Sequence, residues 1–286
     1  ALMLFIALTM PVAEWSNFQP FLPLGEAGVV AAASSIFFAY VGFDAVSTAA
    51  EETKNPQRNV PIGLIGSLGI CTIFYLLVSA GAIGAVGAQP VMGADGNGLI
   101  PGSRLLADQC QSLATAGQQP LVCSREALAL VLREIGWEKI GNLLGLAAFL
   151  ALPSVVLMML FGQTRIFFVM SRDGLLPEVL SRIHPRFKTP HVVTYVTGLG
   201  VTIAAAFFPV GKLADISNSG TLFAFMVVAF AVMILRIKDK SRVRPFRAPV
   251  IWLVGPLAVM GCITLFMFLP TDAKLVFPIW SGIGLV

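Results

Sequence analysis

Long apolar runs without any charged residue restrict what this chain can fold into more than any other feature. The longest of these runs lie at 59–94, 140–164, 189–211, 216–235 and 248–271. A transmembrane helix needs about 20 mainly apolar residues, and every run is long enough. In the whole chain 12% of the residues are charged, whereas soluble domains carry about 25%. The sequence therefore predicts an all-helical, polytopic membrane protein.

The runs and the polar segments between them predict the order of spans and loops. We expect full spans near 28–47, 62–87, 140–169, 190–209, 213–236 and 248–269, with half-spans at 1–12 and 275–286. The two half-spans are too short to cross a bilayer, so we expect a single transmembrane domain that is cut at both ends. Residues 88–138 form the one sizeable polar segment and are expected to be an extracytoplasmic loop.

The basic residues are distributed unequally between the two sides of the predicted membrane. Of the 19 lysines and arginines, 13 fall on the side of the loops at 48–61, 170–189 and 237–247. Cytoplasmic loops carry an excess of lysine and arginine, so these loops are expected in the cytoplasm and the protein in the cytoplasmic (inner) membrane. The net charge of +4 then reflects topology. Nucleic acid is not an expected partner, because the basic residues border spans and lack an interleaved aromatic face.

The segment at 28–47 begins as a span and then changes character. Small residues are followed by the aromatic residues Phe37, Phe38 and Tyr40, and then by Gly42 and Asp44. A charge within the membrane costs about 3 kcal/mol or more, so it is rare unless it faces a cavity or a partner. A helix that frays beside such a carboxylate builds a polar site inside the bilayer, which indicates transport. By sequence alone, Gly42 is either a packing glycine or part of that site.

Two long motifs resemble those of a known superfamily of permeases. They are FFAYVGFDAVSTAAEETKNPQRNVPIG at 37–63 and GQTRIFFVMSRDGLLP at 162–177, and Pro-Phe-Arg-Ala-Pro at 245–249 also fits. They are similar to the amino acid–polyamine–organocation (APC) superfamily, and to its bacterial members akin to cationic amino acid transporters. The resemblance implies a secondary amino acid transporter that works by alternating access. It also implies a LeuT-type fold of inverted repeats, of which this chain would hold the second repeat and the last two helices. With the first repeat absent, residues 1–286 alone are not expected to transport.

The resemblance also implies a substrate site in the broken first helix of this repeat. The site would consist of Phe38, Ala39, Tyr40, Val41 and Gly42. Backbone carbonyls freed by unwinding would accept hydrogen bonds from the ammonium group of an amino acid, and the opposed half-helix would take its carboxylate. Phe38 would cover the bound substrate.

The coupling ion stays open between a proton and Na⁺. Asp44 either marks the inner end of its helix or is a buried carboxylate that gains and loses a proton. Ser154 matches a hydroxyl that lies in the ion-binding region of sodium-coupled relatives, whereas proton-coupled relatives use a lysine that would fall upstream of Ala1. Pro153, next to Ser154, predicts either a local break or a kink without function. The resemblance thus implies proton-coupled transport or exchange, with Asp44 and Ser154 as coupling residues.

The remaining features indicate neither an enzyme nor a metalloprotein. The sequence contains no CxxC and no HExxH pattern, so no cofactor, metal or catalytic site is expected. Cys110 and Cys123 fall in the outer loop and form either a disulfide or two free thiols. Ser124 is the expected N-cap of a helix in the same loop. Residues 171–183 share an apolar face, which predicts a short surface helix or an ordinary connector. A membrane scaffold or receptor without transport is the alternative function, and the oligomeric state stays open.

Overall fold

The computed structural model describes most of the chain, and the described part is helical. It covers residues 1–43, 47, 50, 53–93, 98–99, 104–124, 126–208, 210–239 and 246–284. Within these residues the only pairing of extended chain is an isolated bridge between Met92 and Gly98. The chain divides into two compact units: unit 1 holds Ala1–Val41, Gly69–Ala147 and Gly211–Val286, and unit 2 holds Gly42–Leu68 and Ala148–Val210.

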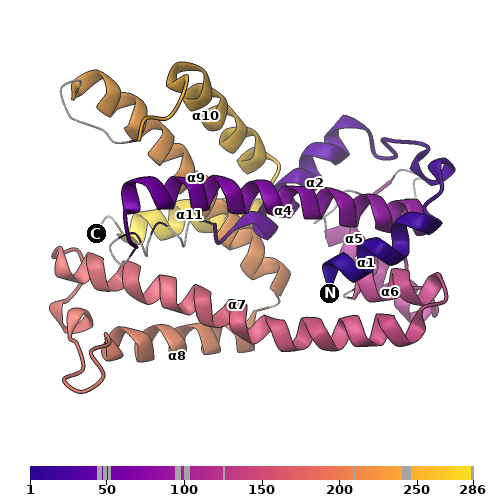
Figure 1. The fold of residues 1–286 in the computed structure, drawn as a ribbon, viewed down its shortest axis with the longest axis horizontal. Helices are drawn as coiled ribbons and strands as arrows, with labels where there is room; N and C mark the ends of the chain where they lie inside the picture. The colour runs from indigo at the N-terminus through magenta and orange to yellow at the C-terminus, as the bar shows by residue number, and fades with distance from the viewer. Residues whose placement is uncertain are drawn as a thin grey trace. The chain divides into compact units, whose positions relative to one another are not determined.

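Helices follow one another along the chain (Figure 1). The α-helices are α1 (Leu2–Thr9), α2 (Gly25–Tyr40), α4 (Pro56–Val86), α5 (Arg104–Thr115), α6 (Ala127–Glu134), α7 (Glu138–Arg172), α8 (His191–Phe207), α9 (Val210–Lys238), α10 (Ile251–Met267) and α11 (Thr271–Gly284). Short 3₁₀ helices are η1 (Met10–Val12), η2 (Trp15–Phe18), η4 (Leu121–Cys123) and η5 (Glu178–Ser181).

Several of these helices have the length and composition of membrane spans. Among the described residues, α4, α7 and α9 qualify singly, and α10 and α11 qualify together as a pair bent by 114°. The most apolar windows of α4 and α7 contain no buried residue at all. Apolar side chains on all sides of a helix are stable only in a core or in lipid. The expectation of an all-helical, multi-pass membrane protein is therefore confirmed.

The best-packed core of unit 1 joins α1, the end of α4 and α6. Phe5, Val131 and Leu132 are completely buried there, and Ala82 is nearly so. The chain after α1 is tied to α4 by two hydrogen bonds to the carbonyl of Gly84, one from the backbone of Glu14 (2.9 Å) and one from the side chain of Asn17 (2.7 Å). This core fixes the extracytoplasmic end predicted for α4.

The end of α7 has a well-defined stop signal. Gly174 takes a left-handed conformation (φ 81°), and the N–H groups of Gly174 and Leu175 donate to the carbonyls of Ser171 and Met170. This is a Schellman motif, which glycine permits without steric cost. The hydroxyl of Ser171 donates to the carbonyl of Pro177 at 2.6 Å. The chain is thus turned away from helical geometry, and of the surface helix predicted at 171–183 only the four residues of η5 form.

The helix α6, in the segment at 88–138, begins later than predicted. Ser124 is not its N-cap; that position belongs to Glu126, whose N–H donates to the Ser124 hydroxyl at 3.2 Å. Arg133 then fixes the corner between α6 and α7, because its guanidinium donates to Glu126 and to Asn142, each at 3.1 Å. The predicted N-cap is wrong because the Ser124 hydroxyl accepts from the N–H of Glu126 in a local turn. Such turns compete with the capping of a helix.

Candidate functional site

A broken helix is predicted in the apolar segment at 28–47, and the structure describes this segment without a gap as far as Phe43. Helix α2 ends at Tyr40, and Val41 is extended (φ −62°, ψ 131°). Gly42 follows with φ 119°, a conformation that residues with a side chain rarely adopt. Within the described residues, helix α2 therefore ends inside an apolar segment, and Gly42 follows it in a left-handed conformation.

The carbonyls at the end of α2 already accept hydrogen bonds. The N–H of Val41 donates to the carbonyl of Phe38 at 3.2 Å, and the hydroxyl of Tyr75 donates to the carbonyl of Ala39 at 2.9 Å. The rings of Tyr40 and Tyr75 meet edge to face, with centroids 5.1 Å apart. A carbonyl oxygen has two lone pairs, so each of these groups keeps the capacity for one more donor.

Sequence reasoning misses Tyr75, which lies in α4. Its signal is the hydroxyl itself, because a phenol in the middle of an apolar run needs a hydrogen-bond partner. Tyr75 donates to a carbonyl in the last turn of α2 and so links α4 to the end of that helix.

Polar contacts hold the body of α2 against α9 and α10 within unit 1. The Ser34 hydroxyl donates to the carbonyl of Leu265 at 3.0 Å, and the Asn218 side chain donates to the carbonyl of Ser34 at 3.3 Å. Asn218 is 1% exposed. The ring of Phe37 packs edge to face on Phe225 at 6.0 Å between centroids. One face of α2 is thus anchored, whereas Phe38, on another face, is 43% exposed.

Gly42 begins unit 2 and lies against α7. A Cβ atom at this position would come within 2.5 Å of the terminal methyl of Met159. The positive φ and the close approach both call for glycine. The close approach fits the interpretation of Gly42 as a packing glycine, and its place in a substrate site stays a prediction.

The structure describes one of the two predicted coupling residues, Ser154. Asp44 lies outside the described residues. Ser154 is exposed on α7, in unit 2. Helix α7 continues through Pro153, so of the two alternatives left open there, a local break or a kink without function, the break does not form. A proline inside a long helix is tolerated where neighbouring groups satisfy the carbonyl that it leaves without a hydrogen bond. The hydroxyl of Ser154 lies next to Pro153 in the sequence.

Comparison with known sequences identifies the family. A model of the family described as amino acid permease matches residues 1–283. The chain belongs to the amino acid permease family. The match covers both motifs at 37–63 and 162–177, and it confirms the resemblance to the APC superfamily. The permease family is one of transporters and not of enzymes.

Curated relatives of this permease include bacterial and plant transporters. The branched-chain amino acid permease BcaP of Bacillus subtilis (strain 168) is 37% identical over 284 residues, which are 99% of this chain and 55% of that protein. The methylthioribose transporter of the same organism is 35% identical over 283 residues, again 99% of this chain and 55% of that protein. The chloroplastic cationic amino acid transporter 9 of Arabidopsis thaliana is 36% identical over 235 residues, 82% of this chain and 35% of that protein. The chain therefore spans about half the length, or less, of these relatives.

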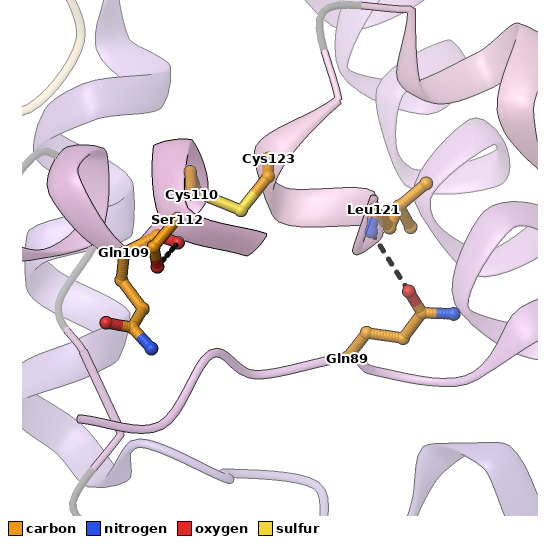
Figure 2. Close-up of a disulfide and its surroundings, with 6 residues drawn as sticks. All are labelled: Gln89, Gln109, Cys110, Ser112, Leu121 and Cys123. Carbon is orange, nitrogen blue, oxygen red and sulfur yellow. Dashed lines mark hydrogen bonds between the residues drawn. A yellow bond between two sulfur atoms is a disulfide. The ribbon is translucent and has the colours of Figure 1, made fainter. Parts of the chain in front are cut away.

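The segment between α4 and α7 contains a disulfide between Cys110 in α5 and Cys123 in η4 (Figure 2). Their Cα atoms are 5.3 Å apart. Near this bond the side chain of Gln89 accepts a hydrogen bond from the N–H of Leu121 at 2.9 Å. The segment that leaves α4 is thereby tied to the disulfide-closed turn.

We expect the Cys110–Cys123 bridge in protein exported to an oxidising face. Non-reducing peptide mapping should recover one linked peptide that contains both residues. The loop is short, so loss of the cross-link should cost at most about 3 kcal/mol. Cys71 and Cys262, which are free in the structure, serve as the control for alkylation. Recovery of Cys110 and Cys123 as alkylated free thiols would show that the bridge does not form.

Proposed function

We propose that this chain is the part of an amino acid permease that carries one half of the substrate site, and that the permease moves amino acids by alternating access. One observation carries the proposal: an apolar, family-matched helix that stops at Tyr40 and turns through Gly42. Such breaks place backbone carbonyls and helix ends near the middle of a membrane, where they bind the charged ends of small substrates. By this proposal the fold is LeuT-type, with the second repeat and the last two helices in residues 1–286.

Coupling to a proton or to Na⁺ belongs to the proposal, with Asp44 and Ser154 as the coupling residues. A proton that moves inward through about 100 mV supplies roughly 2.3 kcal/mol, which supports about 50-fold accumulation of substrate. Exchange of one amino acid for another would need no such gradient. Uptake by proteoliposomes with and without an imposed proton or sodium gradient distinguishes the three modes.

The visible half of the site favours neutral substrates. Its side chains are the aromatic residues Phe37, Phe38 and Tyr40 and small residues. Asp44 is the only acid predicted well inside a span, and it lies toward the inner end. An unpaired cationic side chain at this depth would be costly. The name of the branched-chain permease, a relative at 37% identity, supports the same choice, and we propose neutral, apolar or small amino acids as substrates.

Competition against a labelled neutral amino acid tests this choice. We expect unlabelled leucine and alanine to inhibit uptake of labelled leucine, and arginine and lysine to inhibit it at least about tenfold less, since burying an unpaired charge costs more than the roughly 1.4 kcal/mol of a tenfold difference. The assay uses the protein with whatever sequence precedes or follows these residues naturally. Inhibition by arginine and lysine at concentrations as low as those at which leucine and alanine inhibit would contradict the proposal.

The proposed orientation places the basic loops in the cytoplasm and the loop at 88–138 outside. Gln57 and Gln118 are both exposed and lie on opposite sides by this proposal. We expect a cysteine at Gln118 to react with an impermeant thiol reagent in intact cells, and one at Gln57 to react only after lysis. Alanine at Cys71 and Cys262 removes the free native thiols. Equal labelling of the two positions in intact cells would reverse or abolish the proposed orientation.

A further inference from the structure

Unit 1 contains a cavity of about 360 Å³ that is lined by residues of α9, α10 and α11. One wall of the cavity is aromatic, because the ring centroid of Phe277 lies 4.5 Å from that of Phe223 and 6.0 Å from that of Phe266. Among the described residues of the lining, Lys274 is the only charged one, and Cys262 contributes a free thiol. The cavity therefore combines an apolar lining with a single cation.

Lys274 lies at one end of this cavity, where α10 is followed by α11. Its ammonium group donates to the carbonyl of Met267, the last residue of α10, and the dipole of a helix favours a cation at this end. The lining residues of α10 begin one residue before Met267, at Phe266, and continue about one turn further into the helix, to Cys262. The cavity therefore has its charge at the junction of the two helices and its apolar surface along them.

The ammonium group of Lys274 keeps the capacity to bind an anion. It has three N–H donors, and in the described part of the chain the carbonyl of Met267 accepts from one of them. Asp272 precedes Lys274 by two residues on α11, which is a rotation of about 200° around a helix, so the two side chains leave α11 on different sides. Lys274 is half-buried, and a cation with little access to water gains from an anionic partner.

We infer that this cavity binds a long-chain fatty acid, with the carboxylate on Lys274 and the hydrocarbon chain along the apolar lining. One cation and one apolar cavity match one carboxylate and one chain. A phospholipid would bring a second chain and further polar groups, for which the described lining offers no second charged residue. A short carboxylate would pair with Lys274 but would leave the apolar lining uncovered. The inference concerns the binding of a fatty acid alone, so its outcome is independent of the proposed transport activity.

Alkylation of Cys262 reports whether the cavity is occupied, and Cys71 is a control within the same molecule. Both thiols are free, and Cys71 is exposed on α4, outside the lining. The protein, with any flanking sequence it has naturally, is held in phosphatidylcholine nanodiscs at about pH 8, where carboxyl groups are ionised, and treated with N-ethylmaleimide. Palmitate at about ten times its Kd should slow the alkylation of Cys262 about tenfold and leave that of Cys71 unchanged.

Related ligands separate the contribution of the charge from that of the chain. Methyl palmitate has the same chain without the charge, and it should protect Cys262 only at about fivefold higher concentration. Acetate has the charge without the chain, and it should not protect Cys262 at the concentrations at which palmitate does. Equal protection by methyl palmitate, by acetate or by phosphatidylglycerol would overturn the inference. Saturable binding of radiolabelled palmitate, above that of nanodiscs without protein, is expected as a second measurement, and its absence would also overturn the inference.

Substitution of Lys274 tests the headgroup contact. Lys274→Gln removes the charge but keeps an N–H donor for the carbonyl of Met267, and it should raise the Kd for palmitate about fivefold. Lys274→Arg keeps the charge and should change the Kd less than about twofold. Lys212→Gln is the matched control, because it removes one charge from the exposed start of α9, outside the lining. An equal increase of the Kd in Lys274→Gln and Lys212→Gln would overturn the inference in favour of general surface charge.

Discussion

Valine in place of Gly42 should reduce the initial rate of amino acid uptake at least about tenfold while the protein still inserts into the membrane. Gly42 has φ 119°, and a residue with a side chain in such a conformation is strained by about 1–3 kcal/mol. A change of about 1.4 kcal/mol is a factor of ten in a rate or an equilibrium. Relief of the strain would turn the segment after α2 and displace the carbonyls proposed to hold the substrate.

A second substitution separates two causes of the lost uptake: backbone strain at position 42 and the contact of a new side chain with Met159. The atom that a new Cβ would meet is the terminal methyl of Met159, which is the far end of a flexible side chain. We therefore expect Met159→Ala to restore little of the uptake lost in Gly42→Val, because the backbone strain remains after the contact is removed. Gly145→Val on α7, where nothing lies within 4 Å, is the control. Normal uptake by Gly42→Val at an equal amount of protein would exclude this segment from the site.

Valine in place of Gly84 should lower the free energy of unfolding by about 2 kcal/mol, as expected for overpacking in a close contact. A Cβ atom at Gly84 would lie 2.6 Å from the Cβ of Ala13 and 3.3 Å from its Cα. Backbone cannot move aside as a flexible side chain can, so the chain after α1 would have to shift. The displacement would also strain the hydrogen bonds that Glu14 and Asn17 make to the Gly84 carbonyl.

Gly69 provides the matched control on the same helix. Nothing lies within 4 Å of a Cβ atom built at Gly69, so Gly69→Val adds the same side chain to α4 without this contact. Thermal unfolding of both variants in detergent should show a lower transition for Gly84→Val and little change for Gly69→Val. An equal decrease in both would indicate an effect of valine on the helix itself and not on the approach of the chain after α1.

The sequence predicts the architecture well where the physical cause is local. Apolar runs without charge require helices in lipid, and helices are found at α4, α7 and α9. The end of α2 is also predictable, because glycine and aromatic residues follow a run of small residues. What the sequence does not reveal are partners from distant segments. Tyr75 and Asn218 each bond to α2, and nothing in the residues around either one specifies that partner.

Local errors come from competition between similar hydrogen-bonding arrangements. Ser124 bonds within a turn and does not cap α6, and the Schellman motif at Gly174 ends helical geometry before the predicted surface helix can form. Pro153 does not break α7, and a proline is tolerated within a membrane helix where neighbouring groups satisfy the backbone carbonyl that it leaves unpaired. Propensity alone does not choose between these arrangements, because they differ by only about 1 kcal/mol.

Substrate protection of a thiol at the end of α2 tests the central claim most directly. Cysteine replaces Ala39, which is exposed, in a background with alanine at Cys71 and Cys262, and the protein is assayed with any flanking sequence it has naturally. Saturating leucine should slow the reaction of this thiol with an aqueous reagent at least about tenfold, because a ligand at about ten times its Kd occupies roughly nine-tenths of the sites. A cysteine at Gln118 in the outer loop should react at the same rate with and without leucine. Undiminished reaction at position 39, in protein that takes up leucine, would contradict the placement of the substrate at the break after α2.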